Sequence, residues 1–184
     1  ARALEGGANC ITKQGFIKFC GIVGGPAWKP DETWLYLSGP EAGRAAGCFA
    51  CGPLETTVLG SEPGRASAMK MCYAAYTKGT TALLSAIVAA AERLEVFDAL
   101  MEQWARDWPE LPDSARRRAT RVTRKSWRFA GEMEEIADTF QGAGLPDGFH
   151  RAAGEIYRRT AHFKGASELP TVRDLGRDRA KEAR

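Results

Sequence analysis

Two lysines, Lys70 and Lys78, stand out because they lie in a long stretch of sequence that is otherwise mostly apolar. This stretch, from Gly64 to Arg93, contains no proline and one internal glycine, Gly79. Its apolar residues recur at steps of three, four and seven, which predicts one long helix. Because the apolar residues cover most of the circumference, we expect the helix to lie mostly inside the protein. The expected core-facing side consists of Met69, Tyr73, Tyr76, Leu83, Ile87 and Leu94.

A narrower polar stripe on the same helix holds both lysines. It consists of Ser67, Lys70, Thr77, Lys78, Thr81 and Ser85. Burying an ammonium group without a partner is costly. One interpretation is that the lysines extend to the surface or pair with a structural carboxylate. The other is that a lysine is held in a cleft for proton transfer or for binding an anion. The residues alone leave both open.

The segment Pro63–Tyr73, PGRASAMKMCY, resembles the start of the long helix in the 6-phosphogluconate dehydrogenase and β-hydroxyacid dehydrogenase superfamily. There a glycine precedes the catalytic lysine by six residues, as Gly64 precedes Lys70 here. The segment Tyr76–Gly79 is similar to a subfamily with a helical, phosphogluconate-dehydrogenase-like C-terminal domain. Two further stretches support the resemblance, which covers roughly residues 15–164; they are Leu35–Pro40 and Lys125–Ala137.

The resemblance implies roles for particular residues. Lys70 would be the general acid/base, and the substrate contacts would be Gly24, Gly25, Tyr73, Thr77, Lys78 and His150. In the superfamily a glycine pair helps to hold the substrate carboxylate through backbone amides, although an ordinary loop also explains Gly24 and Gly25 here. Val23 replaces the serine that precedes this pair, and Tyr73 and Ala74 stand where the superfamily has an asparagine. We therefore do not expect 6-phosphogluconate itself to be the substrate. A lone histidine such as His150 is also more often structural than functional.

The implied activity is that of an NAD(P)-dependent oxidoreductase acting on a small hydroxy acid or a related carbonyl compound. The cofactor would be NADP or NAD. However, no Gly-x-Gly-x-x-Gly motif follows a strand in this sequence, so the turn that binds the pyrophosphate is missing and the cofactor-binding residues stay unknown. Either these residues are part of a longer enzyme or cofactor binding has been lost. The alternative function is a non-catalytic helical dimerisation module that keeps the family fold.

The pattern of elements predicts a mainly α fold with a small β portion. Strands are expected at 15–23, 33–37 and 55–59, with a small helix at 41–50. This order resembles the closing strands of a Rossmann-type α/β domain, so residues 1–62 are expected to be the remnant of an NAD(P)-binding domain. Residues 63–184 are expected to form an all-α domain of the 6-phosphogluconate dehydrogenase type. Its later helices are expected at 95–108, after an N-cap within Leu111–Ser114, at 127–140, at 148–163 after an Asp147 cap, and in the tail 172–184.

Composition limits the compartment and the partners. No apolar run is long enough to span a bilayer, and the N-terminus lacks a signal-peptide pattern, so a soluble, cytoplasmic protein is expected. The five cysteines are scattered, and the Cys48–Cys51 pair has no second pair of ligands nearby, so no metal site is expected. The resemblance implies a homodimer that binds a small-molecule substrate.

A basic cluster precedes an acidic segment. Its members are Arg116, Arg117, Arg118, Arg121, Arg124, Lys125 and Arg128. A nucleic-acid surface would have this charge, but the net charge of the chain is only +3 and few aromatic residues interrupt the cluster. We favour a solvated helix face that pairs with Glu132, Glu134, Glu135 and Asp138, and expect no nucleic-acid partner. An arginine that binds phosphate or carboxylate stays open.

Overall fold

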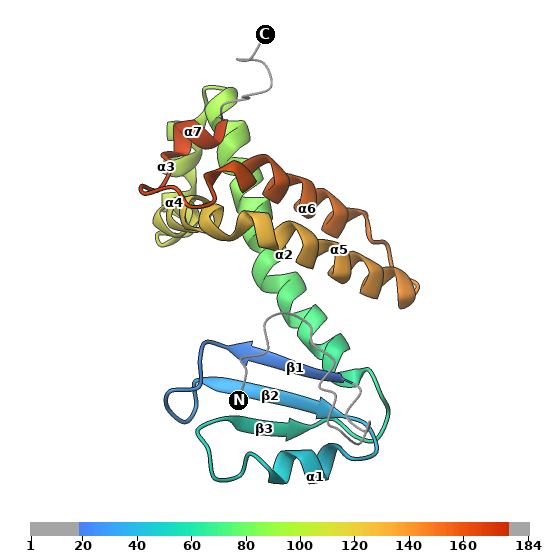
Figure 1. Ribbon diagram of the computed structural model, residues 1–184. Coiled ribbons are helices and arrows are strands. Elements are labelled where there is room, and N and C mark those ends of the chain that lie inside the picture. Colours follow the sequence, from blue (N-terminus) through green and yellow to red (C-terminus); the bar gives the residue numbers. More distant parts are fainter. Residues whose placement is uncertain (1–18, 177–184) are drawn as a thin grey trace. The chain divides into compact units, whose positions relative to one another are not determined.

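The structure, a computed structural model, describes residues 19–176 of the 184. It consists of two compact units, of which the first ends at Tyr73 and the second begins at Ala74. The elements (Figure 1) are β1 (Phe19–Gly24), β2 (Thr33–Ser38), α1 (Ala42–Gly47), β3 (Glu55–Val58), α2 (Arg65–Arg93), α3 (Phe97–Asp107), α4 (Leu111–Val122), the 3₁₀ turn η1 (Thr123–Lys125), α5 (Ser126–Gly142), α6 (Gly148–Thr160), the 3₁₀ turn η2 (Ala161–Phe163) and α7 (Val172–Gly176).

The predicted fold class is confirmed: a small sheet precedes a part of the chain that is helical. The strands expected at 33–37 and 55–59, the small helix after Pro40 and the long helix after Gly64 are all present, with ends shifted by a few residues. The first four residues of the strand expected at 15–23 lie outside the described residues. The expected domain boundary between residues 62 and 63 stays a prediction.

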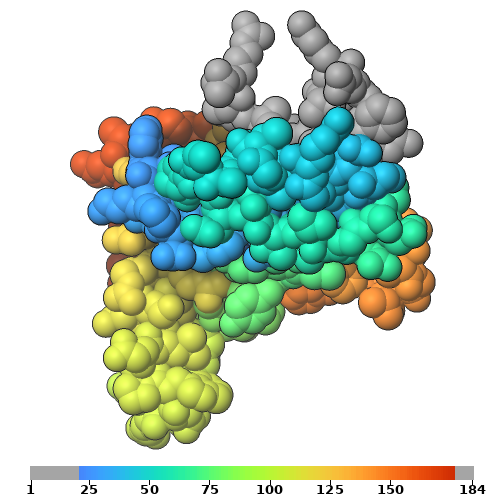
Figure 2. All heavy atoms as spheres, turned by 90° about the horizontal axis from the view of Figure 1, so that it is seen from below, coloured from blue at the N-terminus to red at the C-terminus, as the bar shows by residue number. Residues whose placement is uncertain are grey.

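The first unit contains a three-stranded sheet in the order β1-β2-β3. β1 is antiparallel to β2, with Gly24 opposite Thr33, and β3 is parallel to β2. Parallel neighbours need a crossover connection, and α1 supplies it, so β2, α1 and β3 form a βαβ unit. Leu35 and Leu37 of β2 are buried against Ala42 and Ala45 of α1. Figure 2 looks onto the side of this unit that carries α1, where its atoms are blue to cyan.

The second unit is helical. α5 and α6 lie side by side (Figure 1), joined by a short connection, and enclose the largest buried side chains of the unit, among them Met133, Ile136 and Tyr157. A second cluster consists of Val88 from α2 with Ala115 and Ala119 from α4. Within residues 19–176 no helix has both the length and the apolar character needed to cross a bilayer.

The expected core-facing side of α2 is wrong. Four of its six members are exposed: Tyr76 by 73%, Leu94 by 71%, and Tyr73 and Leu83 by about half, while Met69 and Ile87 are partly buried. The buried residues are mostly small, namely Ala66, Ala74, Ala75, Gly79, Ala82 and Ala91, together with Val88 and Ser85. Small side chains allow neighbouring elements to pack close to the helix axis, so the large residues of α2 are left on the opposite face.

The helix ends also differ in part from those predicted from the sequence. α4 begins at Leu111, with Glu110 at the N-cap position and Pro112 in the first turn, a favoured place for proline, so the N-cap expected within Leu111–Ser114 lies one residue earlier. Asp147 does occupy the N-cap position of α6, but its carboxylate accepts a hydrogen bond from Arg151 Nε at 2.7 Å instead of capping the backbone. The tail helix is described only as α7, because the residues after Gly176 lie outside the described part.

Most of the expected pairing between the basic cluster and the acidic segment does not occur. Among the described residues of the cluster, only Arg128 pairs with an expected carboxylate, that of Glu132, at 3.3 Å. Glu134 and Asp138 instead form ion pairs with arginines of α6, Arg151 and Arg158. Because α6 packs against α5, the arginines of α6 lie closer to these carboxylates of α5 than the basic cluster does.

Candidate functional site

Lys70 lies in the second turn of α2, within the first unit, and is partly buried. Its ammonium group makes no hydrogen bond or ion pair with any residue of the described part of the chain. A lysine that is sheltered but not engaged by a carboxylate can bind a ligand or exchange a proton with it.

Strand β1 fixes the base of this lysine. It passes the start of α2 at Gly21, where a methyl group in place of the glycine hydrogen would lie 2.7 Å from the carbonyl oxygen of Ala66 and 3.0 Å from Cβ of Lys70. The first of these distances is too short for a real contact with backbone. Only glycine therefore allows β1 to lie against the root of the Lys70 side chain.

Strand β2 holds the same end of α2. Ser38, at its last position, is fully buried, and its Oγ accepts a hydrogen bond from the backbone N–H of Ala66 at 3.1 Å. The first N–H groups of a helix have no partner within the helix, so this hydroxyl satisfies one of them from outside. Two strands thus set the position of the turn from which Lys70 projects.

The glycine pair predicted to contact substrate lies at the end of β1. Gly24 has φ +114°, and a side chain there would lie 2.3 Å from the carbonyl oxygen of Glu32, so glycine is required. Thr33 Oγ1 donates to the carbonyl of Gly25 at 2.6 Å, which fixes the turn. A side chain added at Gly25 would meet nothing within 4 Å, so a ligand can approach its backbone.

Lys78 lies in the second unit and has different surroundings. Its ammonium forms an ion pair with Glu132 and lies 5.0 Å from the centre of the Phe129 ring. Its backbone carbonyl accepts a hydrogen bond from the Tyr157 hydroxyl at 2.7 Å. Of the two interpretations that the sequence left open, Lys78 therefore follows the first: it pairs with a structural carboxylate.

Thr77 and His150 also lie in the second unit. The carbonyl of Thr77 accepts hydrogen bonds from Thr81 Oγ1 at 2.8 Å and Arg118 Nη2 at 3.4 Å. His150 is buried, with its ring centre 4.2 Å from that of Phe140 and 5.3 Å from that of Phe149. Burial lowers the pKa of His150, and the nearby Asp147 opposes this shift.

The predicted site residues therefore fall into two groups. Lys70, Tyr73, Gly24 and Gly25 belong to the first unit; Thr77, Lys78 and His150 belong to the second. Within the first unit, the structure brings Lys70 against the strand that ends at the glycine pair.

Sequence analysis named Arg118 only as one member of the basic cluster. It missed the other residues that hold these groups, namely Gly21, Ser38, Glu132 as the partner of Lys78, and Tyr157. A glycine inside a strand pattern is a known sign of close backbone approach, and it could have identified Gly21. The others carry no comparable signal, since their partners are distant in sequence.

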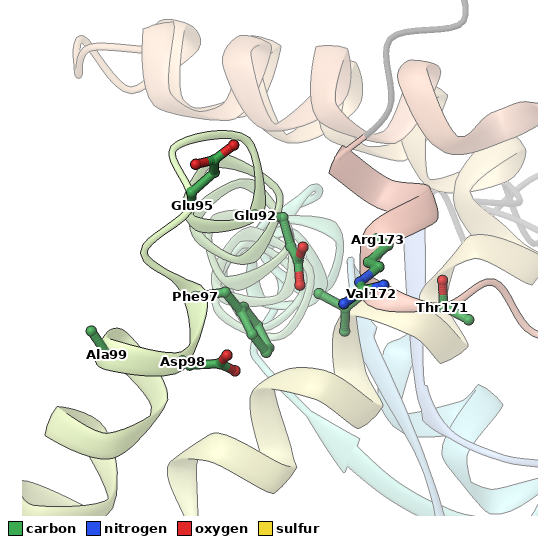
Figure 3. A pocket seen from close by; sticks show the side chains of 8 residues that line it. All are labelled: Glu92, Glu95, Phe97, Asp98, Ala99, Thr171, Val172 and Arg173. Carbon is green, nitrogen blue, oxygen red and sulfur yellow. The ribbon is translucent and has the colours of Figure 1, made fainter.

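A hollow of about 610 Å³ lies elsewhere in the second unit, near the end of α2. Figure 3 shows Glu92, Phe97 and Asp98 on one side and Arg173 of α7 on the other. None of the predicted site residues lines it.

Comparison with known proteins gives similarity at the level of fold and domain. The family model of a domain of unknown function, DUF1932, matches residues 91–160. A conserved hypothetical protein from Sinorhizobium meliloti 1021 has a structure that matches with a TM-score of 0.65 and 26% identity, over 85% of this chain and 54% of that one. The search of curated proteins gave no match.

A second similar structure is that of MTH1747, a conserved protein of unknown function described as structurally similar to 3-hydroxyacid dehydrogenases. It matches with a TM-score of 0.63 and 26% identity, over 86% of this chain and 58% of that one. The chain thus spans a little more than half the length of each of these two proteins. The resemblance to hydroxyacid dehydrogenases that the sequence suggested is supported in its broad form, and the subfamily stays a prediction.

Proposed function

We propose that this chain is part of an NAD(P)-dependent oxidoreductase that acts on a small hydroxy acid or a related carbonyl compound, with Lys70 as general acid/base. The observation that supports this most is the placement of Lys70, sheltered and without a partner among the described residues, against a strand that ends in an accessible glycine turn. The structural similarity of MTH1747 to 3-hydroxyacid dehydrogenases supports the reaction class.

The role of Lys70 is proton transfer at the substrate oxygen. In its neutral form the amine accepts the hydroxyl proton as the alcohol becomes a carbonyl, and in the reverse direction the ammonium returns it. Gly21 and Gly24 are three residues apart on β1, which is about 10 Å along a strand. A substrate whose carboxylate is held by the amides of the glycine turn would then be small enough for its hydroxyl to meet the lysine.

The described residues do not fit a complete dinucleotide site. The turn that leads from β2 into α1 contains one glycine, Gly39, and α1 is only six residues long. A pyrophosphate site of the Rossmann type needs a glycine-rich turn at the start of a longer helix. We therefore assign no residue to cofactor binding, and leave NAD and NADP as equal choices.

The experiment is an assay of the protein expressed from its complete coding sequence. Small 2-hydroxy and 3-hydroxy acids are supplied with NAD or NADP, and formation of the reduced cofactor is followed by absorbance. The proposal predicts substrate-dependent reduction with at least one of these acids. Absence of turnover, together with no measurable affinity for either cofactor, would contradict it.

A non-catalytic dimerisation module is the second candidate, and the missing glycine-rich turn favours it. Its discriminating property is cofactor affinity of the complete gene product, which a dehydrogenase needs and such a module does not. A homodimer is proposed in both cases, and the exposed face of α2 with Tyr76 and Leu83 supports it.

A further inference from the structure

We infer that Arg118 of α4 anchors an oxyanion, a phosphate or carboxylate group of a small molecule, on the second unit. Lys78 and Arg128 would strengthen the positive potential at this site. All of the residues of this site belong to the second unit, and the inference does not require the proposed dehydrogenase activity.

Arg118 is held in place by neutral groups of α2. Its Nη2 donates to Thr80 Oγ1 and Thr81 Oγ1, both at 2.7 Å, and more weakly to the carbonyl of Thr77 at 3.4 Å. Its Nε donates to Thr81 Oγ1 at 3.2 Å. The two threonine hydroxyls give their own protons to the carbonyls of Tyr76 and Thr77, so they act toward Arg118 as acceptors only.

One edge of the guanidinium, the one that carries Nη1, is not engaged by the described residues. Arg118 Nη1 has no hydrogen-bond acceptor and Arg118 has no carboxylate partner among residues 19–176. The side chain is partly buried. Sheltering a cation among neutral acceptors leaves its charge uncompensated, which is unfavourable unless an anion completes the site.

The charges of the neighbouring groups have the same sign. Lys78 and Arg128 share a single carboxylate, that of Glu132. With Arg118 the group holds three cations and one anion. Tyr157 lies close to these groups. Its hydroxyl donates a hydrogen bond to the carbonyl of Lys78. Burial raises the pKa of Tyr157, while the charge of Arg118 lowers that pKa and the charge of Glu132 raises it further. The group thus carries a net charge of about +2, which a doubly charged phosphate would balance and a carboxylate would reduce by one.

The geometry also selects the kind of ligand. A guanidinium offers planar, paired N–H donors that match the oxygens of a carboxylate or phosphate, and its threonine contacts fix the orientation of that plane. Arg117, the preceding residue, is exposed and makes no such contacts with the described residues. This difference makes Arg117 a matched control on the same helix.

The test is a titration of the 184-residue chain with inorganic phosphate and, separately, with acetate, at constant ionic strength set by chloride. Two-dimensional NMR follows the Nε–H signal of Arg118 and the amides of Thr80 and Thr81. We expect saturable shifts of these signals with at least one of the two anions. Arg118→Gln should weaken that binding at least tenfold, whereas Arg117→Gln should leave it within twofold.

The two anions separate the possible sources of the ligand group. Response to phosphate alone identifies a phosphate site, response to acetate alone identifies a carboxylate site, and response to both supports the shared chemistry. No saturable shift at the Arg118 Nε–H of the unmodified chain would overturn the inference, and this readout does not depend on any variant folding. Equal weakening by Arg117→Gln would also overturn it, because binding would then reflect general charge.

Discussion

At the scale of single residues, two lysines of one helix have opposite surroundings. Lys78 is paired with Glu132, whereas Lys70 has no partner among the described residues and rests on a glycine of a neighbouring strand. The ammonium of Lys78 is occupied by a carboxylate of the protein, whereas that of Lys70 is available to a ligand. Proton transfer is therefore assigned to Lys70, whereas Lys78 contributes positive charge to the electrostatic potential around Glu132.

The buried histidine gives a prediction about pH. Burial lowers the pKa of His150 below its ordinary value of about 6.5, so the folded state keeps the ring neutral while the unfolded state binds a proton. The stabilising contribution is present above about pH 6.5 and is lost as the pH falls below it. Thermal unfolding between pH 8 and pH 5 should show the unmodified chain losing stability, and His150→Phe should lose less over the same range. Parallel curves for the two proteins would contradict this prediction.

The sequence predicted part of the residue-level picture. The spacing of Gly64 and Lys70 identified the lysine as a candidate, since a short motif on one helix is visible in one dimension. It did not single out Arg118 from the seven residues of the basic cluster, because what distinguishes Arg118 is its contact with Thr80 and Thr81, almost forty residues away. Partners of that kind are set by packing and leave no mark in local spacing.

At the scale of elements, the contact between β1 and α2 depends on Gly21. In Gly21→Ala the added methyl group would overlap the carbonyl oxygen of Ala66, so the strand or the helix must shift. We expect a loss of about 1–3 kcal/mol in the free energy of unfolding, as for other overpacked sites, measured by urea denaturation.

Gly43→Ala is the matched control for this variant. Gly43 lies in α1 of the same unit, and an added methyl group there meets nothing within 4 Å. Alanine favours helix over glycine by about 0.5–1 kcal/mol, so this variant should be as stable as the unmodified chain or more so. An equal loss of stability in both variants would show that the close approach at Gly21 is not the cause.

Tyr157 connects α6 to α2 through one hydrogen bond. The side chain is fully buried, and its hydroxyl is the group that donates to the carbonyl of Lys78. Tyr157→Phe keeps the ring and removes the donor, so the free energy of unfolding should fall by about 1–2 kcal/mol. Tyr76→Phe, at an exposed position of α2, should change it by less than about 0.5 kcal/mol. Indistinguishable denaturation midpoints for the two variants would show that this hydrogen bond does not contribute to stability.

The order of elements was predictable, whereas the buried face of α2 was not. Strands and helices follow from local periodicity and from glycine and proline, and these signals located every strand and long helix that the structure describes. The exposure of Tyr76 and Leu83 reverses the expectation from hydrophobicity, because alanines at Ala74, Ala75 and Ala82 allow closer packing than large side chains do. Hydrophobic spacing alone does not show which of two apolar faces is buried.

At the scale of the whole molecule, the exposed apolar face of α2 bears on assembly. Tyr76 and Leu83 lie about two turns apart on this helix, and they are 73% and 48% exposed. Apolar side chains grouped in this way are typical of a surface that is covered by a partner. Sedimentation velocity at micromolar concentration should therefore show a dimer, and Tyr76→Glu should shift it toward monomer. A single monomeric species of the unmodified chain would contradict the homodimer.

The assignment of Lys70 as general acid/base is best tested by measuring turnover of the complete gene product carrying Lys70→Ala. Lys29→Ala serves as the control, because Lys29 is an exposed lysine of the same unit. General acid/base groups contribute about 10²–10⁴-fold to rate, so Lys70→Ala should lose at least about a hundredfold in kcat while unfolding at the same temperature as the unmodified protein. Lys29→Ala should keep its rate within about twofold. A Lys70→Ala protein that is folded and turns over substrate at a near-normal rate would contradict the assignment.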